Sequence, residues 1–314
     1  MAGFIVHRLL TTLVVLAIVS LLSFSLMQLV PGDPALVLAG IGATGDQVQH
    51  IREEFGLDQP FIVQLLRWYA GLLHGDLGDS VLLGQSVMRA IAEHVPPTVS
   101  VAVFASVLSI VVGVGSGILA AVQQRKIVDR IIMGVAVLGV SVPSFWLGLL
   151  LMVLLAVQLD WLPAGGYVPL AQDPWQWFRS LVLPGVSLAL LQIGYLAQIT
   201  RNALIEVLRQ DFIRSARAKG LVEWTVVTKH ALSNAMLPIL TVAGIMFSLL
   251  LSGSVVTETV FSVPGLGRLM ANAILSRDYP VIQGTLLLTA AAFAFINLLV
   301  DILYVMADPR VAYE

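Results

Sequence analysis

Apolar residues occur along this chain in long blocks that no charged side chain interrupts. Six stretches of 21 to 30 residues contain no Asp, Glu, Lys, Arg or His. They lie between Arg8 and Asp33, His94 and Arg125, Arg130 and Asp160, Arg179 and Arg201, His230 and Glu258, and Asp278 and Asp301. Because a helix rises about 1.5 Å per residue, about 20 apolar residues cross the hydrocarbon core of a bilayer. The pattern therefore predicts six transmembrane helices.

These blocks indicate the organisation of an all-α, polytopic membrane protein. We expect residues 1–30 to hold the N-terminus and first span, and residues 31–96 to form an extracytoplasmic region. Residues 97–314 form the membrane core, with five spans at about 97–123, 132–158, 181–200, 234–257 and 282–305. The first block is not a typical cleavable signal, because its apolar run exceeds the usual length of about 7–15 residues.

Lysine and arginine counts orient the helices, because short cytoplasmic loops carry more of these residues than outer loops do. With the N-terminus inside, eleven of the 17 Lys and Arg residues fall on cytoplasmic segments. The other six are spread over the longer outer segments, whereas the loop 201–233 alone holds six of the eleven. We therefore expect both termini in the cytoplasm.

Composition agrees with this interpretation and excludes several function classes. Hydrophobic residues make up 58% of the chain and charged residues 11%, whereas soluble domains carry about 25% charged residues. The absence of cysteine excludes disulfides, thiolate nucleophiles and iron–sulfur clusters. A net charge of −2, without a basic patch containing aromatic residues, argues against binding of nucleic acid.

The sequence also lacks the motifs of an enzyme. It contains no His-Glu-x-x-His pattern for a metal and no G-x-x-x-x-G-K-[S/T] loop for a nucleotide phosphate. An intramembrane serine protease needs a serine and a histidine within the spans. Ser252 and Ser254 provide the first, but no predicted span contains a histidine. We therefore expect no catalytic residue, no metal site and no cofactor bound by this chain.

Two acidic residues at or near the predicted spans are candidates for a translocation path. Burying an acid in a membrane is costly unless it is paired, so such residues are often functional. Asp301 lies about two turns from the inner end of the last span, where snorkelling to the interface or pairing with an arginine of the inner loop is the alternative explanation. Glu258 lies at the outer end of the fifth span, where an interfacial position is the alternative.

The loop 201–233, expected in the cytoplasm, is basic and has a structured helix–glycine–helix pattern. The run 202–219 has apolar residues at helical spacing and predicts an amphipathic continuation of the fourth span. Gly220 then ends the helix, because glycine adopts the left-handed conformation there without steric cost. A second helix follows around Trp224. Binding to anionic lipid, or topology alone, explains the positive charge but not this glycine-broken helix pair.

The loop resembles the EAA loop of ABC importer permeases, E-A-A-x-x-x-G followed after nine residues by I-x-L-P. Arg214, Ser215 and Ala216 stand at E-A-A, Gly220 at the glycine, and residues 230–233 at the second part. The match is closer to the B-type permeases of dipeptide and oligopeptide importers, with ARAKG at 216–220 and HALSNA at 230–235. Further landmarks of that family follow in order: LVPGDP (29–34), GLDQP (56–60), GDLGDS (75–80), VPSFWLG (142–148), WLPAGGY (161–167), VFSVPGLGRL (260–269) and RDYPVIQG (277–284).

The resemblance implies a type I ABC importer permease in a bacterial inner membrane, with residues 97–314 as the permease core. Such a permease pairs with a second homologous permease, two cytoplasmic ABC ATPases and an extracytoplasmic solute-binding protein, and it contacts membrane lipid. ATP and Mg would be bound by the ATPases. The cargo implied is a di- or oligopeptide, with glutathione, a nickel complex or another small solute as the alternative. A stand-alone secondary carrier or channel is the alternative of another class, but its coupled ionisable residues are expected in several spans.

The resemblance also assigns roles within the loop. Gly220 would make the turn, Ala216 would allow close docking, and Leu221 and Trp224 would contact the ATPase. The remaining residues of the coupling segment are Arg214, Ser215, Arg217 and Lys219. Because Arg214 occupies the position of the general motif's acid, no role that needs that carboxylate is expected here.

Overall fold

A computed structural model describes residues 2–29, 35–36, 43–54, 56–80, 82–251 and 255–307. Over this part of the chain the regular structure is helical, apart from a short antiparallel hairpin of β1 (Asp79–Ser80) and β2 (Gln85–Ser86). Three helical segments, labelled η, are π-helical. The helices are α1 (Ala2–Leu29), α3 (Gly45–Glu54), α4 (Phe61–Leu73), α5 (Val87–Ser109), η1 (Ile110–Val114), α6 (Gly115–Val122), α7 (Ile127–Ser141), α8 (Ser144–Leu151), η2 (Met152–Gln158), α9 (Pro174–Leu208), α10 (Asp211–Ala218), α11 (Glu223–Thr225), η3 (Val226–Ala231), α12 (Leu232–Leu251), α13 (Val255–Val260), α14 (Leu266–Ser276) and α15 (Tyr279–Ala307).

Five helical runs within the described residues are long and apolar enough to cross a membrane. They are His7–Ser25, Val87–Val122, Pro174–Leu208, Glu223–Leu251 and Tyr279–Ile302. A sixth candidate is the pair Ile127–Ser141 and Ser144–Gln158, which is bent by 100°. We expected one span at 132–158, but Pro143 disfavours helical geometry at the residue before it, and Val142 is extended with ψ 126°. The chain is therefore an all-α, polytopic membrane protein, with five candidate spans in the described residues, or six if the bent pair is one span.

Helix α9 lies at the centre of the fold and packs against α5, α6, α7, α8 and α12. Its close contacts depend on glycine: a Cβ on Gly117 of α6 would lie 2.6 Å from the Cβ of Thr200 in α9. A Cβ on Gly194 of α9 would lie 2.5 Å from the carbonyl oxygen of Ala136 in α7. Small residues thus let three helices approach closely, as membrane helices commonly do.

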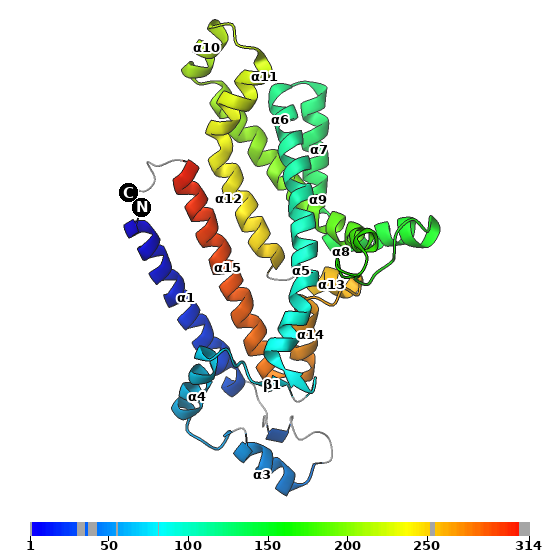
Figure 1. Cartoon of the computed structure of the whole chain (residues 1–314). Helices are drawn as coiled ribbons and strands as arrows, with labels where there is room; N and C mark the ends of the chain where they lie inside the picture. Colours follow the sequence, from blue (N-terminus) through cyan, green and yellow to red (C-terminus); the bar gives the residue numbers. More distant parts are fainter. Residues whose placement is uncertain are drawn as a thin grey trace.

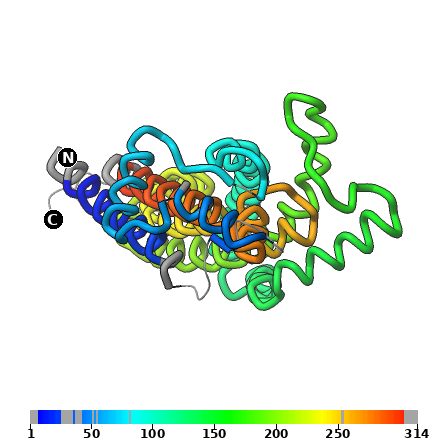
Figure 2. The backbone as a smooth tube through the Cα atoms, turned by 90° about the horizontal axis from the view of Figure 1, so that it is seen from below, coloured from blue at the N-terminus to red at the C-terminus, as the bar shows by residue number. Residues whose placement is uncertain are grey.

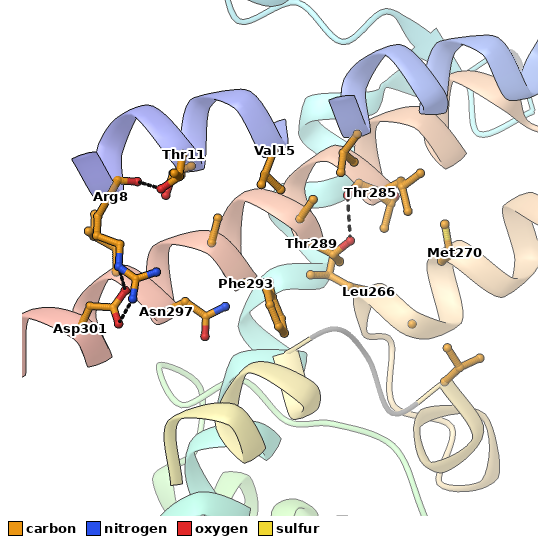
Figure 3. Close-up of a pocket in the computed structure, with 18 residues that line it drawn as sticks. Arg8, Thr11, Val15, Leu266, Met270, Thr285, Thr289, Phe293, Asn297 and Asp301 are labelled. Carbon is orange, nitrogen blue, oxygen red and sulfur yellow. Dashed lines mark hydrogen bonds and ion pairs between the residues drawn. The ribbon is translucent and has the colours of Figure 1, made fainter. Parts of the chain in front are cut away.

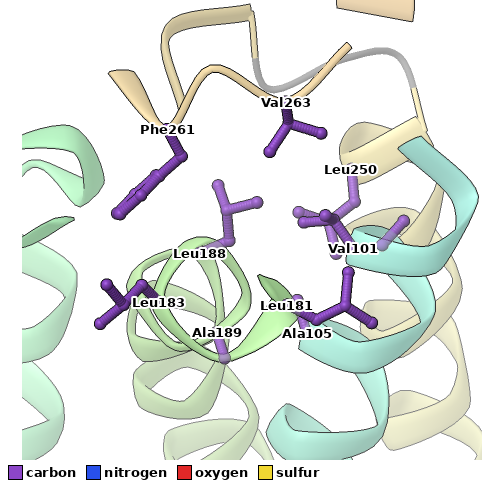
Figure 4. Close-up of a cluster of buried hydrophobic side chains, with 10 residues drawn as sticks. Val101, Ala105, Leu181, Leu183, Leu188, Ala189, Leu250, Phe261 and Val263 are labelled. Atoms are coloured by element: carbon purple, nitrogen blue, oxygen red, sulfur yellow. The ribbon is translucent and has the colours of Figure 1, made fainter. Parts of the chain in front are cut away.

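The largest buried apolar cluster joins α5, α9 and the end of α12 to the segment after α13 (Figure 4). Its fully buried members are Val101, Ala102, Ala105, Leu181, Leu183, Leu188, Ala189, Leu250, Phe261 and Val263. Helices α1 and α15 pack together at one edge of the bundle, and α15 also packs against α12 (Figure 1). The α8 segment projects from the opposite side of the molecule (Figure 2).

Candidate functional site

The loop 201–233, which the sequence predicts to be cytoplasmic, folds into a helical elbow, which we define as residues 209–231. Helix α9 ends at Leu208, and Gln210 is extended with ψ 154° before α10 begins. The continuous helix expected over 202–219 is therefore wrong: it is two helices. The break allows α10 to fold back and bury one face. Its Ile213 and Ala216 join an apolar core with residues of α9, η3 and α12: Leu204, Val207, Val226, Ala231, Ala235 and Ile239.

Gly220 makes the turn between the two arms of the elbow. Its φ is +80°, the left-handed conformation that the sequence predicts. The N–H of Leu221 donates to the Ala216 carbonyl oxygen at 3.4 Å, and the N–H of Gly220 donates to that of Arg217 at 2.9 Å. These two bonds are the Schellman pattern that satisfies the free carbonyls at the end of a helix. The Cβ of an alanine at this position would have no atom within 4 Å, so glycine is needed here for the left-handed backbone conformation and not for space.

An ion pair also holds the arms together. The Arg217 guanidinium of α10 donates to Glu223 of α11 from Nε at 3.0 Å and from Nη2 at 2.6 Å. This two-point geometry fixes orientation as well as distance. The Glu223 carboxylate raises the pKa of Arg217 further above its ordinary value. The elbow is therefore fixed both by its backbone turn and by a side-chain pair across the turn.

Large apolar side chains are exposed on the surface of the elbow, between charged ones. Trp224 is 71% exposed, and Leu221, Val222 and Phe212 are also exposed. Leu221 and Trp224 were predicted as contact residues, but sequence reasoning missed Phe212 and Val222. The sequence signal for Phe212 was its place directly before Ile213, which the helical spacing assigns to the apolar face of the helix. An aromatic residue next to that face is expected to be exposed. Exposed large apolar residues of this kind suit contact with lipid or with another protein.

The other predicted residues of the loop fall in two places. Ala216, expected at a docking contact, is buried in the elbow's own core, where its small side chain lets α10 pack closely. Arg214, Ser215 and Lys219 are exposed on α10 and its end. Arg214 pairs with Asp211 at 3.3 Å, one turn earlier on the surface of α10. Their contact with an ATPase stays a prediction.

A buried ion pair that sequence reasoning missed anchors α9 beside the elbow. The Arg201 guanidinium donates to Asp129 of α7 from Nε at 2.5 Å and from Nη2 at 2.8 Å. The backbone N–H of Arg125 donates to the same carboxylate at 2.8 Å. The only signal in the sequence was position: Arg201 bounds one charge-free block, and Asp129 lies one residue before Arg130, which bounds another. The pair ties α7 to the part of α9 that leads into the elbow.

A cleft of about 630 Å³ lies between α1 and the helices α14 and α15 (Figure 3). Asp301 lines it and is paired with Arg8 of α1, with Nε and Oδ2 3.0 Å apart. This is the pairing with an arginine that the sequence left open, although the partner is the N-terminal arginine rather than one of the inner loop. Thr285, Thr289 and Asn297 place polar groups along the same face of α15. The role of Asp301 in a translocation path stays a prediction.

Glu258, the second predicted path residue, is 2% exposed and faces the start of α14. Its Oε1 accepts from the Thr98 hydroxyl at 2.7 Å, and its Oε2 accepts from the Arg268 N–H at 2.9 Å. The Thr98 hydroxyl oxygen accepts in turn from the N–H of Leu266 at 2.8 Å. Burial raises the pKa of Glu258, while these donors oppose the rise. The carboxylate thus satisfies free N–H groups at a helix N-terminus, and a path role stays a prediction.

The comparisons with known proteins agree with this architecture. The family model described as "Binding-protein-dependent transport system inner membrane component" matches residues 113–313. A model of the N-terminal part of the same type of membrane component matches residues 1–102. The chain belongs to this family. The permease resembles relatives over its whole length, and it shares its fold with a solved importer.

A peptide transport system permease protein of Brucella abortus (strain 2308) is 51% identical to this permease, and the alignment covers all of both chains. The glutathione transport system permease protein GsiC of Escherichia coli O6:H1 is 40% identical, again over all of both chains. Among solved structures, the inward-facing MetNI methionine ABC transporter has a chain with a TM-score of 0.58 and 19% identity. That match covers 70% of this permease and 97% of the other chain, and it supports the fold alone.

These findings place the permease in the inner membrane as a multi-pass subunit of an ABC importer. It is the membrane component rather than an enzyme, and it works with permease and ATPase partners. Within the described residues, no group of three or more His, Cys, Asp or Glu side chains is placed to hold a metal ion.

Proposed function

We propose that this permease imports di- or oligopeptides together with a second, homologous permease, and that two cytoplasmic ATPases drive it through the elbow. The observation that carries the proposal is the exposed apolar surface around Trp224 on a segment fixed at both arms. A flexible loop would absorb the movement of a bound partner. The elbow is instead held by the Gly220 turn, the Arg217–Glu223 pair and its own buried core.

The elbow connects directly to two spans, and this supports its action as a lever. Its first arm packs on α9, and its second arm continues through η3 into α12 without a break. A displacement applied at Trp224 therefore reaches both spans. Interfaces between packed helices have discrete arrangements, so such a displacement can switch the opening of a path between two faces. The Asp129–Arg201 pair extends the moving unit to α7.

The cargo and the remaining partners are proposed from the relatives and the sequence. The relative that is 51% identical is named for peptide transport, and the one that is 40% identical for glutathione transport. Glutathione is thus the alternative cargo for the same machine. A solute-binding protein would deliver cargo to the outer segments 31–96 and 259–283. We propose that ATP and Mg are bound by the ATPases and that this permease binds no cofactor.

Substitution of Trp224 by Asp tests the proposal in proteoliposomes that contain the whole importer. We expect peptide uptake to be lost, and ATP hydrolysis to lose its response to peptide, while membrane insertion is unchanged. Ile127→Asp is the matched control, because Ile127 is a 72% exposed apolar residue at the cytoplasmic start of α7, outside the elbow. Normal uptake by the Trp224→Asp variant would contradict the proposal. Uptake by the purified permease alone, without ATP or partners, would favour a stand-alone carrier.

A further inference from the structure

Helix α4 packs against a membrane-spanning helix, although the sequence predicts an extracytoplasmic position for it. The ring centroid of Phe24 in α1 lies 5.5 Å from the centroids of both Phe61 and Trp68 in α4. The hydroxyl oxygens of Ser20 in α1 and Tyr69 in α4 are hydrogen-bonded at 2.8 Å. Figure 1 shows α4 beside the outer part of α1. The two helices therefore lie side by side.

The residues of α1 that make these contacts give the depth of α4 in the bilayer. Ser20 and Phe24 lie inside the candidate span His7–Ser25, and Arg8 stands at its inner end. At a rise of about 1.5 Å per residue, Ser20 and Phe24 lie about 18 and 24 Å along the helix from Arg8. Because the hydrocarbon core is about 30 Å thick, α4 contacts α1 about 6–12 Å below the outer edge of that core. A tilt of α1 would place the contacts deeper.

The two strongly polar side chains of α4, Gln64 and Arg67, turn toward the loop before the helix. The Gln64 Nε2 donates to two carbonyl oxygens of that loop, at 2.8 and 3.3 Å. The Arg67 guanidinium lies over Gly56, where it would collide with any Cβ. The other polar groups on the side chains of α4 belong to Trp68 and Tyr69, residue types that are enriched at membrane interfaces. The remaining circumference of the helix is apolar.

An apolar stripe on α4 has no cover in the described part of the structure. Ile62, Leu66 and Leu73 follow helical spacing, so they share one face, and they are 66%, 63% and 86% exposed. Ile18 of α1, which lies within a span, is 53% exposed. The stripe is thus at least as bare as the surface of a membrane-spanning helix. Helices that lie in a membrane interface bury their apolar face about 5–10 Å deep, which agrees with the depth of α4.

We propose that α4 is an interfacial membrane helix and that its stripe, Ile62, Leu66 and Leu73, contacts the acyl chains of the outer lipid leaflet. Part of the region 31–96 then lies in the membrane rather than outside it, and α4 fixes this region to the bilayer beside α1. The surface binds lipid and has no part in cargo binding or in contact with an ATPase. It stands whether or not the elbow is a lever, so its test is independent of the transport assay.

Fluorescence quenching in lipid nanodiscs that contain the whole importer, with cysteine-free partner subunits, tests the surface. The chain has no cysteine, so a bimane label can be placed at one position in each of the variants Leu66→Cys, Ile18→Cys and Asp46→Cys. Ile18 lies about 15 Å from Arg8, near the middle of the bilayer, and Asp46 is exposed on the polar helix α3. The quenchers are lipids brominated at different depths and aqueous iodide.

We expect brominated lipids to quench the Leu66→Cys label, most strongly with bromine near the headgroup, whereas bromine near the chain end should quench the Ile18→Cys label more. Iodide should quench the Leu66→Cys label at least about fivefold less than the Asp46→Cys label, because hydrocarbon excludes charged groups. Leu73→Cys should repeat the pattern of Leu66→Cys. Equal iodide quenching at positions 66 and 46 would place the stripe in water and refute the proposal. Protection from both quenchers would show that a protein covers the stripe, and it would refute the proposal equally.

Discussion

Replacement of Gly220 by alanine perturbs the elbow through its backbone alone. The residue has φ +80°, and no atom lies within 4 Å of the Cβ that alanine would add. Steric collision therefore contributes nothing, and the remaining cost is that of holding an L-residue in the left-handed conformation, about 1–2 kcal/mol. A change of this size shifts the equilibrium between the closed and open turn by about 5- to 30-fold.

Hydrogen–deuterium exchange of the elbow measures this shift directly. The N–H groups of Gly220 and Leu221 exchange only when the turn opens, because both donate to carbonyl oxygens of α10. We expect their exchange to be about 5- to 30-fold faster in the Gly220→Ala variant. Gly220→Asn should have a smaller effect, because asparagine tolerates the left-handed conformation better than alanine does. Coupled transport should fall in the same order.

Gly115→Ala provides the control for this experiment. Gly115 also has no atom within 4 Å of an added Cβ, but its φ is −59°, which alanine adopts without strain. Its replacement should leave exchange in the elbow unchanged. If Gly220→Ala also left the exchange of the Leu221 N–H unchanged, the left-handed turn would not hold the elbow, and the lever would lose its physical basis.

Two further predictions concern buried charges. Asp129→Ala should lower the free energy of unfolding by about 3 kcal/mol, because it leaves Arg201 without its partner. This is the lower end for a broken buried pair, since the Arg201 side chain is 21% exposed and can reach water. Thermal melting in detergent measures the loss against Asp46→Ala, which removes an exposed carboxylate, and equal melting temperatures of the two variants would contradict the prediction. Glu258→Gln should lower it by about 1–3 kcal/mol, because an amide –NH₂ would face the Thr98 hydroxyl or the Arg268 N–H. The exposed Glu93→Gln is its control, and a Glu258→Gln variant no less stable than that control would show that the carboxylate does not hold α14.

Sequence alone predicted the features that depend on short stretches of chain. Charge-free blocks located the spans because bilayer thickness sets their length, and Gly220 marked a helix end because only glycine takes a left-handed φ freely. Pro143 is itself a local signal for the helix break. The charge-free block from 131 to 159 is nevertheless long enough for one uninterrupted span, so the block length alone predicted no break. The Asp129–Arg201 pair joins residues 72 positions apart, and Glu258 caps a helix from outside it. Such contacts depend on how helices pack, which no periodicity in one segment specifies.

Two ion pairs, Arg217–Glu223 in the elbow and Asp129–Arg201 beside it, differ in their exposure to water. Arg217 and Glu223 are exposed, so water screens their attraction and the pair contributes little stability, yet its two-point geometry still fixes the angle between the arms. Asp129 and Arg201 are more buried, so separating them leaves a poorly solvated charge. We therefore expect movement at the elbow to displace α7 and α9 together rather than to pull them apart. The shared core of α9, α10, η3 and α12 has the same effect on the other arm. A partner that binds at Trp224 acts on one packed unit, so loss of its apolar contact would stop transport without unfolding the permease.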